Sequence, residues 1–174
     1  MKLKDLEVLF SEEQLQRRIC EVAGEIDKFY NGEEVTAVCV LKGAVIFASD
    51  LVRYLNMPLQ MEFIRLSSYG SSTSTSGKVN AVDIKLPDLN GKNVLIIEDI
   101  VDTGLTAKFL IDFMNMNFHV KTLKFCSLLD KKMTRKVDIA PDYYCFDVED
   151  QFVVGYGLDY DGYYRNLPYI AYKP

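Results

Sequence analysis

The chain has 174 residues, 49% of them hydrophobic and 26% charged, with a formal net charge of −5. These values are typical of one globular domain with an ample core, and the acidic balance argues against a nucleic-acid or anionic membrane partner. Because no apolar run reaches the length of a membrane span and the first residues lack the apolar core of a secretory signal, we expect a cytoplasmic protein.

Cysteine and histidine usage excludes several kinds of site. The four cysteines, Cys20, Cys39, Cys126 and Cys145, are far apart, and apolar neighbours around the first three predict reduced thiols in the core. His119 is the only histidine, and we expect it at the surface. The chain therefore offers no Cys/His cluster for zinc, and a Ser-His-Asp or Cys-His mechanism would have to use His119.

The first third of the chain predicts helices alternating with apolar strands. Ser11 and Gln14 form a capping box, and apolar residues at helical spacing predict a helix to about Tyr30, ended by Asn31 and Gly32. The expected elements that follow are a strand over residues 35–41, a helix from Gly43 to about residue 55, and a strand over residues 59–66.

Residues 67–78 consist almost wholly of Ser, Thr and Gly. Such a segment buries too little apolar surface to order itself, so we expect a mobile loop. A long polar loop between strands is often a lid over an active site, and a solvated connector without a role is the equal alternative.

The rest of the chain continues the alternation. We expect strands over residues 81–86, 93–98, 122–129, 143–147 and 152–156, a turn at 88–91 and a helix over 106–116. This order predicts a parallel α/β sheet, in which ligands bind beyond the carboxyl ends of the strands. Lys42, Gly43, residues 98–106 and Lys131 all follow such ends, so we expect a site there.

Residues 94–106, VLIIEDIVDTGLT, carry the strongest functional signal. A buried strand runs into Glu98 and Asp99, and a small turn with two threonine hydroxyls then opens a helix, whose N–H groups suit a monophosphate. The two acids suit sugar hydroxyls or Mg²⁺, and an acidic strand end capped by lysines is the structural alternative. The P-loop lysine of nucleotide hydrolases is absent, which disfavours hydrolysis of a nucleoside triphosphate.

This stretch resembles the phosphoribosyl-pyrophosphate motif of type I phosphoribosyltransferases. Residues 63–69 (FIRLSSY), 127–131 (SLLDK) and 152–160 (FVVGYGLDY) resemble the 6-oxopurine salvage enzymes of that family, the hypoxanthine(-guanine) phosphoribosyltransferases. The resemblance, over about residues 35–165, implies the type I phosphoribosyltransferase fold in a single domain. A parallel α/β core of about residues 35–137 would be flanked by helices, with a small hood built from the N-terminal segment and about residues 138–174.

The resemblance implies transfer of the 5-phosphoribosyl group from phosphoribosyl pyrophosphate to N9 of hypoxanthine, and of guanine, with Mg²⁺ as cofactor. A homodimer or homotetramer is expected from the family. One alternative is the same fold acting on xanthine or adenine, although Lys131 with Phe152 argues against adenine. A second alternative is a regulator that senses phosphoribosyl pyrophosphate and binds nucleic acid, which would need a basic surface or an added DNA-binding domain. A third is a generic sugar-phosphate binding protein.

The resemblance also assigns residues around the ribose phosphate. Glu98 and Asp99 would meet the ribose hydroxyls, partly through Mg²⁺, and Asp102 would act near N7 of the purine as general base or as stabiliser of positive charge. The residues expected at the 5′-phosphate are Asp102, Thr103, Gly104, Leu105 and Thr106. Those expected at the pyrophosphate are Leu41, Lys42, Gly43, Ser68, Tyr69 and Arg165, with Arg135 nearby and a cis peptide before Lys42.

At the purine, the resemblance implies that Lys131 donates to the exocyclic O6, which favours a 6-oxo base because an ammonium group has donors only. Phe152 would stack on the ring and the Val153 backbone would read its edge. Asp159 would line this part of the site and ligate a second Mg²⁺. Residues 67–78 match the closing loop of the family, although here the loop carries no acidic residue.

Overall fold

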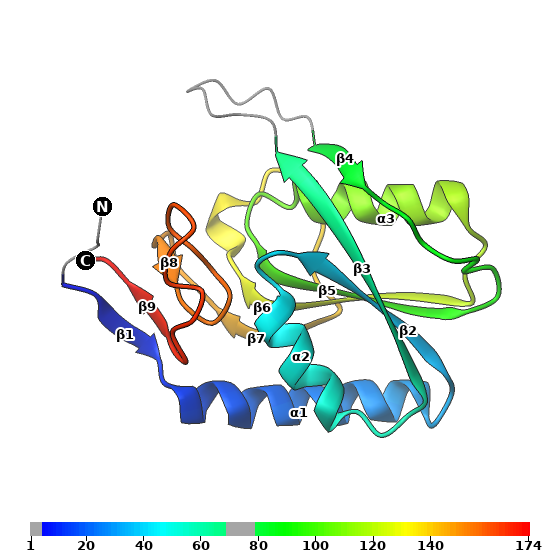
Figure 1. The fold of residues 1–174 in the computed structure, drawn as a ribbon, viewed down its shortest axis with the longest axis horizontal. Helices are drawn as coiled ribbons and strands as arrows, with labels where there is room; N and C mark the ends of the chain where they lie inside the picture. The colour runs from blue at the N-terminus through cyan, green and yellow to red at the C-terminus, as the bar shows by residue number, and fades with distance from the viewer. Residues whose placement is uncertain (1–4, 69–78) are drawn as a thin grey trace.

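The computed structural model describes residues 5–68 and 79–174 (Figure 1). Helices and strands alternate along the chain as predicted. In chain order, the elements are β1 (Glu7–Phe10), α1 (Glu12–Tyr30), β2 (Val35–Leu41), α2 (Val45–Tyr54), β3 (Leu59–Ser68), β4 (Val79–Asp83), β5 (Asn93–Val101), α3 (Leu105–Asn117), β6 (Thr122–Asp130), the 3-10 turn η1 (Lys132–Thr134), β7 (Tyr143–Asp147), β8 (Val153–Val154) and β9 (Ile170–Tyr172).

The main sheet has six strands in the order β4-β3-β2-β5-β6-β7. β2 pairs in parallel with β3 and β5, and β6 pairs in parallel with β5 and β7, whereas β4 pairs antiparallel with β3. A second sheet has three antiparallel strands in the order β1-β9-β8. The expected α/β fold, a parallel core flanked by helices with a small hood, is confirmed, and the second sheet forms the hood.

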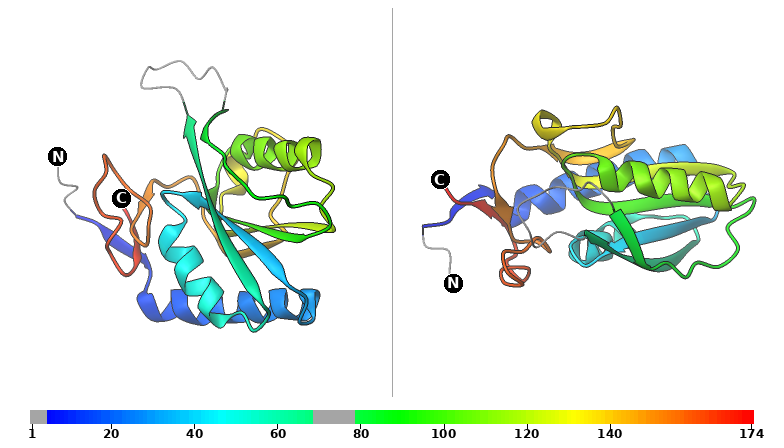
Figure 2. Two further views of the ribbon diagram at one scale, coloured as in Figure 1. Left: turned by 45° about the vertical axis from the view of Figure 1, so that its right-hand side comes forward. Right: turned by 90° about the horizontal axis from the view of Figure 1, so that it is seen from above.

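Helices cover both faces of the main sheet, α1 and α2 on one side and α3 on the other (Figure 2). Successive side chains of a strand point to opposite faces. Leu95 and Ile97 of β5 accordingly pack in the core cluster with α1 and α2, while Val94 and Ile96 pack in the cluster with α3. β5 is therefore buried from both sides, and its carboxyl end lies in the middle of the sheet edge.

The first helix begins and ends where its capping residues predict. The Ser11 hydroxyl accepts a hydrogen bond from the Gln14 N–H, and the Gln14 side chain accepts one from the Ser11 N–H, which completes the capping box. Asn31 adopts the left-handed conformation that closes the helix. The buried stripe of α1 runs through Leu15, Ile19 and Val22, and Cys20 lies outside that stripe.

Several sequence predictions differ from the structure. Cys20 is exposed rather than in the core, whereas the other three cysteines are buried, and all four are free thiols. β4 covers residues 79–83 instead of 81–86. β8 has two residues instead of the expected 152–156, because the chain turns back after Val154. β1 and β9 were not predicted, because each is short and becomes a strand by pairing with the other from the opposite end of the chain. His119 is exposed, as expected.

Among the residues that the structure describes, no helix is both long enough and apolar enough to cross a membrane.

Candidate active site

Three neighbouring strands bring most of the predicted site residues to one edge of the main sheet. β2 ends at Leu41, β5 at Val101 and β6 at Asp130, so Lys42, Asp102 and Lys131 each follow a strand directly. A cavity of about 390 Å³ is lined by residues 98–104, Thr106 and Ala107. A second, of about 180 Å³, is lined by Asp99, Ile100, Asp102, Lys131, residues 151–153, Leu158 and Asp159. The two cavities adjoin, because Asp99, Ile100 and Asp102 line both.

The first cavity ends at the start of α3. The first N–H groups of a helix have no acceptor within the helix, so they are available to an anion. The Thr103 hydroxyl accepts from the Leu105 N–H at 3.4 Å, and Thr106 lines the same cavity. Gly104 has a φ of 80°, and a Cβ there would come within 2.8 Å of Arg135 Cδ and Ile139 Cγ2. The turn that aims these N–H groups therefore requires glycine at position 104.

Glu98 and Asp99 lie inside β5, which continues to Val101 rather than ending at the acids. Glu98 is only 7% exposed, its Oε1 accepts the Asp99 N–H at 3.3 Å, and its Oε2 has no hydrogen-bond partner among the described residues. Burial raises the pKa of Glu98 well above its ordinary value, and the neighbouring Asp99 charge raises it further. Burial likewise raises the pKa of Asp99. Two adjacent carboxyl groups, one buried and one partly buried, fit a cation or a set of hydroxyl donors.

A divalent metal at these acids would need most of its ligands from elsewhere. Within residues 5–68 and 79–174, no three His, Cys, Asp or Glu side chains are grouped as a metal site. Mg²⁺ is commonly held in proteins by one or two carboxylates together with substrate phosphates and water. The pair of Glu98 and Asp99, with the unpartnered Oε2 of Glu98, is compatible with that mode of binding.

The buried Glu98 carboxylate should lower stability at neutral pH. A folded-state pKa above the unfolded value of 4.5 means that the folded state holds this proton more tightly, so stability falls as the pH rises from about 4.5 through the folded pKa. Glu98→Gln should therefore have a higher Tm than the unsubstituted protein at pH 7.5, by about 2–4 °C for each kcal/mol relieved, and the difference should shrink towards pH 4.5. Thermal unfolding across this pH range measures the difference in Tm and its change with pH.

Exposed Glu34 provides the matched control, since Glu34→Gln should leave the Tm unchanged. A Glu98→Gln protein that is less stable at neutral pH, or whose Tm difference does not vary with pH, would contradict a destabilising carboxylate.

The second cavity contains a lysine with two of its donors already engaged. Lys131 Nζ lies 2.8 Å from Asp150 Oδ1 and 3.3 Å from the Gln151 carbonyl oxygen, and the side chain is 11% exposed. An ammonium group carries three donors, so one is left for a ligand. Phe152 is half exposed and forms a T-shaped pair with Tyr160 at 5.7 Å between ring centroids, which leaves at least one face of its ring for stacking.

The loop after β2 packs directly against the acids. The Leu41–Lys42 peptide is cis, as expected. A Cβ on Gly43 would lie 1.5 Å from Asp99 Oδ2, and a Cβ on Gly157 would lie 2.1 Å from the Gly43 carbonyl oxygen. Only glycines at positions 43 and 157 allow these close contacts, which join the loop after β2 to the segment after β8.

The same segment carries Arg165 and Asp159. Arg165 Nη1 donates to the Gly157 carbonyl at 2.6 Å, and its Nη2 lies 2.5 Å from Asp159 Oδ1. The other Asp159 oxygen accepts the Gly162 N–H at 2.8 Å. Asp159 shares the second cavity with Asp99, but its carboxylate is engaged by Arg165 and this turn.

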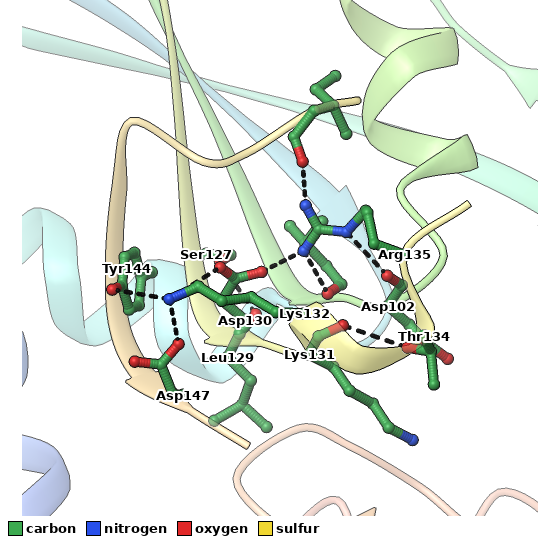
Figure 3. A network of polar contacts seen from close by, with 12 residues as sticks. Asp102, Ser127, Leu129, Asp130, Lys131, Lys132, Thr134, Arg135, Tyr144 and Asp147 are labelled. Carbon is green, nitrogen blue, oxygen red and sulfur yellow. Dashed lines mark hydrogen bonds and ion pairs between the residues drawn. The ribbon is translucent and has the colours of Figure 1, made fainter. Parts of the chain in front are cut away.

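Not every predicted residue lies where the sequence places it. Tyr69 and most of the expected closing loop lie outside the described residues, and Ser68 is described only as the last residue of β3. Arg135 lines neither cavity. Its guanidinium donates to the carbonyls of Val101 and Asp102 and pairs with Asp130, behind the turn that opens α3 (Figure 3). The expectation that Arg135 lies near the pyrophosphate stays a prediction.

The polar residues that hold the site together had no role in the predictions from sequence. Asp130 is 1% exposed and pairs with Arg135, and the Thr134 hydroxyl donates to Asp102 Oδ1. Asp150 and Gln151, the partners of Lys131, were missed as well. The polar run DKKMTRK at residues 130–136, directly after a buried strand, is the signal from which the Thr134 and Arg135 contacts could have been suspected.

A third cavity, of about 320 Å³, lies around the amino ends of β2 and β5. It contains none of the predicted site residues. Lys121 and Glu33 on its wall pair with each other at 2.5 Å, so these two charges satisfy one another.

Comparison with known proteins gives consistent matches over nearly the whole chain. The model of the phosphoribosyl transferase domain matches residues 7–161. The hypoxanthine-guanine phosphoribosyltransferase of Bacillus subtilis (strain 168) is 44% identical over 172 residues, covering 98% of this chain and 95% of that protein. The enzyme of the same name from Aquifex aeolicus (strain VF5) is 46% identical over 166 residues, covering 95% and 93%.

Solved structures of similarly named enzymes also match this chain. A crystal structure of a hypoxanthine-guanine phosphoribosyltransferase from Bacillus anthracis, with a HEPES molecule in its active site, matches with a TM-score of 0.91 and 46% identity, covering 99% of this chain and 100% of that one. A ternary substrates complex of the Trypanosoma cruzi hypoxanthine phosphoribosyltransferase matches with a TM-score of 0.88 and 39% identity, covering 96% and 94%.

Proposed function

The chain belongs to the type I phosphoribosyltransferase family, and we propose that it transfers the 5-phosphoribosyl group from phosphoribosyl pyrophosphate to N9 of hypoxanthine or guanine. Pyrophosphate leaves, and the product is IMP or GMP, so the reaction salvages purines. The observation that carries this proposal is the shared wall of the two cavities, Asp99, Ile100 and Asp102. A ribose phosphate bound in one cavity and a purine bound in the other would meet at that wall.

Residues 102–106 hold the 5′-phosphate. The N–H groups at the start of α3 and the hydroxyls of Thr103 and Thr106 surround the cavity end where an anion fits, and the helix dipole adds partial positive charge there. Glu98 and Asp99 accept hydrogen bonds from the ribose hydroxyls. Their placement deep in the same cavity is compatible with this role.

Asp102 acts at N7 of the purine. Its carboxylate lies on the wall between the cavities and is exposed to them, so it faces the base on one side and the ribose on the other. There it takes up the N7 proton as general base, or stabilises the positive charge that develops on the ring.

Lys131, Phe152 and Val153 read the purine. The remaining donor of Lys131 is directed to O6 of the purine. The 6-amino group of adenine could not accept this hydrogen bond. Phe152 stacks on the ring, and the Val153 backbone meets its edge. Leu41, Lys42, Gly43 and Arg165 hold the leaving pyrophosphate, with Ser68 and Tyr69 at the base of the closing loop.

Mg²⁺ is the cofactor in this proposal. Glu98 and Asp99 would hold the ion, with the substrate supplying further oxygens, and Asp159, whose carboxylate is paired with Arg165, would contribute to a second ion. When bound, the metal would neutralise charge on the pyrophosphate oxygens. The chain acts in the cytoplasm as a homodimer or homotetramer.

The test is a spectrophotometric assay of nucleotide formation. Protein is mixed with Mg²⁺, phosphoribosyl pyrophosphate and, separately, hypoxanthine, guanine, xanthine or adenine. Product with hypoxanthine or guanine and little with adenine is the expected result. Equal turnover of adenine would contradict the role of Lys131, and binding of phosphoribosyl pyrophosphate without turnover of any base would favour the regulator.

A further inference from the structure

The 3-10 turn after β6 places a hydroxyl group on the carboxylate at the wall of the site. Thr134, the last residue of this turn, donates its hydroxyl hydrogen to Asp102 Oδ1 (Figure 3). Its oxygen also lies 3.2 Å from the carbonyl oxygen of Lys131. Thr134 therefore touches both of the residues that the proposed function assigns to O6 and N7 of the purine, Lys131 through its main-chain carbonyl.

Backbone and side-chain contacts hold this turn against the segment that carries Asp102. The Lys131 N–H donates to the Val101 carbonyl at 2.9 Å, and the Lys136 N–H donates to the Thr103 carbonyl at 2.9 Å. Residues on both sides of Thr134 are thus fastened to residues on both sides of Asp102. The distance between the two side chains is set by this pairing rather than by a flexible loop.

A buried ion pair reinforces the same junction. Arg135 donates from Nε to the Asp102 carbonyl at 3.1 Å and from Nη2 to the Val101 carbonyl at 3.2 Å. Its charge is balanced by Asp130, which is 1% exposed. Because a buried charge is costly unless it is paired, this arrangement keeps Arg135, and with it Thr134, in one position.

We propose that Thr134 is a positioning residue for Asp102, acting through its hydroxyl group and not by contact with substrate. A carboxylate at the end of a strand can rotate, and the hydrogen bond to Oδ1 fixes its plane, which leaves Oδ2 to act at N7. The inference rests on the role of Asp102 in the proposed function.

The second acceptor near Thr134 gives the hydroxyl group two positions. It has one hydrogen, which goes to the carboxylate while Asp102 is ionised, because a bond to a charged acceptor is the stronger. When Asp102 Oδ2 takes up a proton from the base, the Lys131 carbonyl becomes a competing acceptor for the same hydrogen. Thr134 keeps its own proton throughout.

The test is a double-mutant cycle on kcat. Thr134→Val keeps the shape of the side chain and removes the hydroxyl group, and we expect kcat to fall about tenfold while KM for base and for phosphoribosyl pyrophosphate changes less than about twofold. Thr134→Ser, which retains the hydroxyl group, should restore most of kcat. In an Asp102→Ala background, Thr134→Val should have no further effect, because no carboxylate remains to be positioned.

Thr122→Val provides the matched control. The Thr122 hydroxyl donates to Asn93 Oδ1 at 3.0 Å at the other end of β6, so its loss should leave kcat unchanged. Thr134→Ala serves as a second hydroxyl-free variant where the valine protein folds poorly by circular dichroism, and the same loss is expected.

Three results would overturn the inference, and they are distinguishable. If Thr134→Val keeps full kcat while Asp102→Ala loses activity, Thr134 does not position Asp102, and the proposed function is unaffected. The same further loss in the Asp102→Ala background shows that Thr134 only supports the fold. Full activity of Asp102→Ala itself removes the assigned role of Asp102 and, with it, the basis of this inference.

Discussion

Asp102→Asn should lower kcat about 10²–10³-fold while phosphoribosyl pyrophosphate still binds. The amide keeps the size of the side chain and still accepts the hydrogen bond from Thr134, but it carries no negative charge and cannot take up a proton at neutral pH. The phosphate contacts come from the start of α3, so they do not depend on this charge. Steady-state kinetics with hypoxanthine, together with calorimetric titration of Mg²⁺ and phosphoribosyl pyrophosphate, separates the two effects.

Asp112→Asn is the matched control for this substitution. Asp112 is an exposed aspartate of α3 that pairs with Lys108 at 2.9 Å, one helical turn apart. Its loss should leave kcat within about twofold, since exposed pairs of this kind contribute little to stability. An Asp102→Asn protein with more than a third of the original kcat would show that the chemistry at N7 does not use the carboxylate.

Lys131→Met should lower kcat/KM for hypoxanthine about 100-fold and change the order of preference among bases. The lysine contributes a charged donor inside a cavity where its other two donors are already engaged by Asp150 and the Gln151 carbonyl. Loss of a charge-assisted hydrogen bond commonly costs about 1.5–3 kcal/mol, which corresponds to about 10–150-fold. Because adenine gains nothing from this donor, turnover of adenine should fall much less.

The neighbouring residue, Lys132, allows a matched comparison. It points away from the cavity and binds Asp147 at 2.6 Å and the Tyr144 hydroxyl at 3.2 Å (Figure 3). Lys132→Met should leave the ratio of hypoxanthine to adenine turnover unchanged. If both lysine variants shift that ratio equally, base selection does not depend on a donor inside the cavity.

Local sequence patterns were sufficient where local interactions decide the structure. The capping box of Ser11 and Gln14 placed the start of α1, and Asn31 placed its end. The apolar run of β5 placed the central strand, and its acidic end placed the site, because the carboxyl ends of parallel strands share one edge of the sheet. These features depend on residues within a few positions of one another.

Contacts between distant residues could not be predicted in the same way. β1 is a strand through its pairing with β9 at the opposite end of the chain, in which Glu7 lies opposite Tyr172, and β9 also pairs with β8. The central strand was expected to end at the acids, yet β5 continues through both to Val101, and Asp99 meets Gly43 from a different strand end. A pattern in one segment does not contain the position of its partner.

The binding partners of the charged segment at residues 130–136 could not be predicted from its sequence. Its charges are also typical of a solvated loop, and Arg135 was expected near the pyrophosphate. Its actual partners are main-chain carbonyls of Val101 and Asp102, which become accessible only because β5 and β6 end side by side. The chemistry of the side chain was readable from the sequence, but the group that it binds was not.

The most direct test of the whole account is a crystal structure of the protein with IMP bound. The account predicts the 5′-phosphate at the N–H groups of residues 103–106, the ribose hydroxyls at Glu98 and Asp99, and O6 of hypoxanthine within hydrogen-bond distance of Lys131 Nζ, with N7 facing Asp102. A nucleotide whose base points away from Lys131, or whose phosphate lies elsewhere than the start of α3, would contradict it.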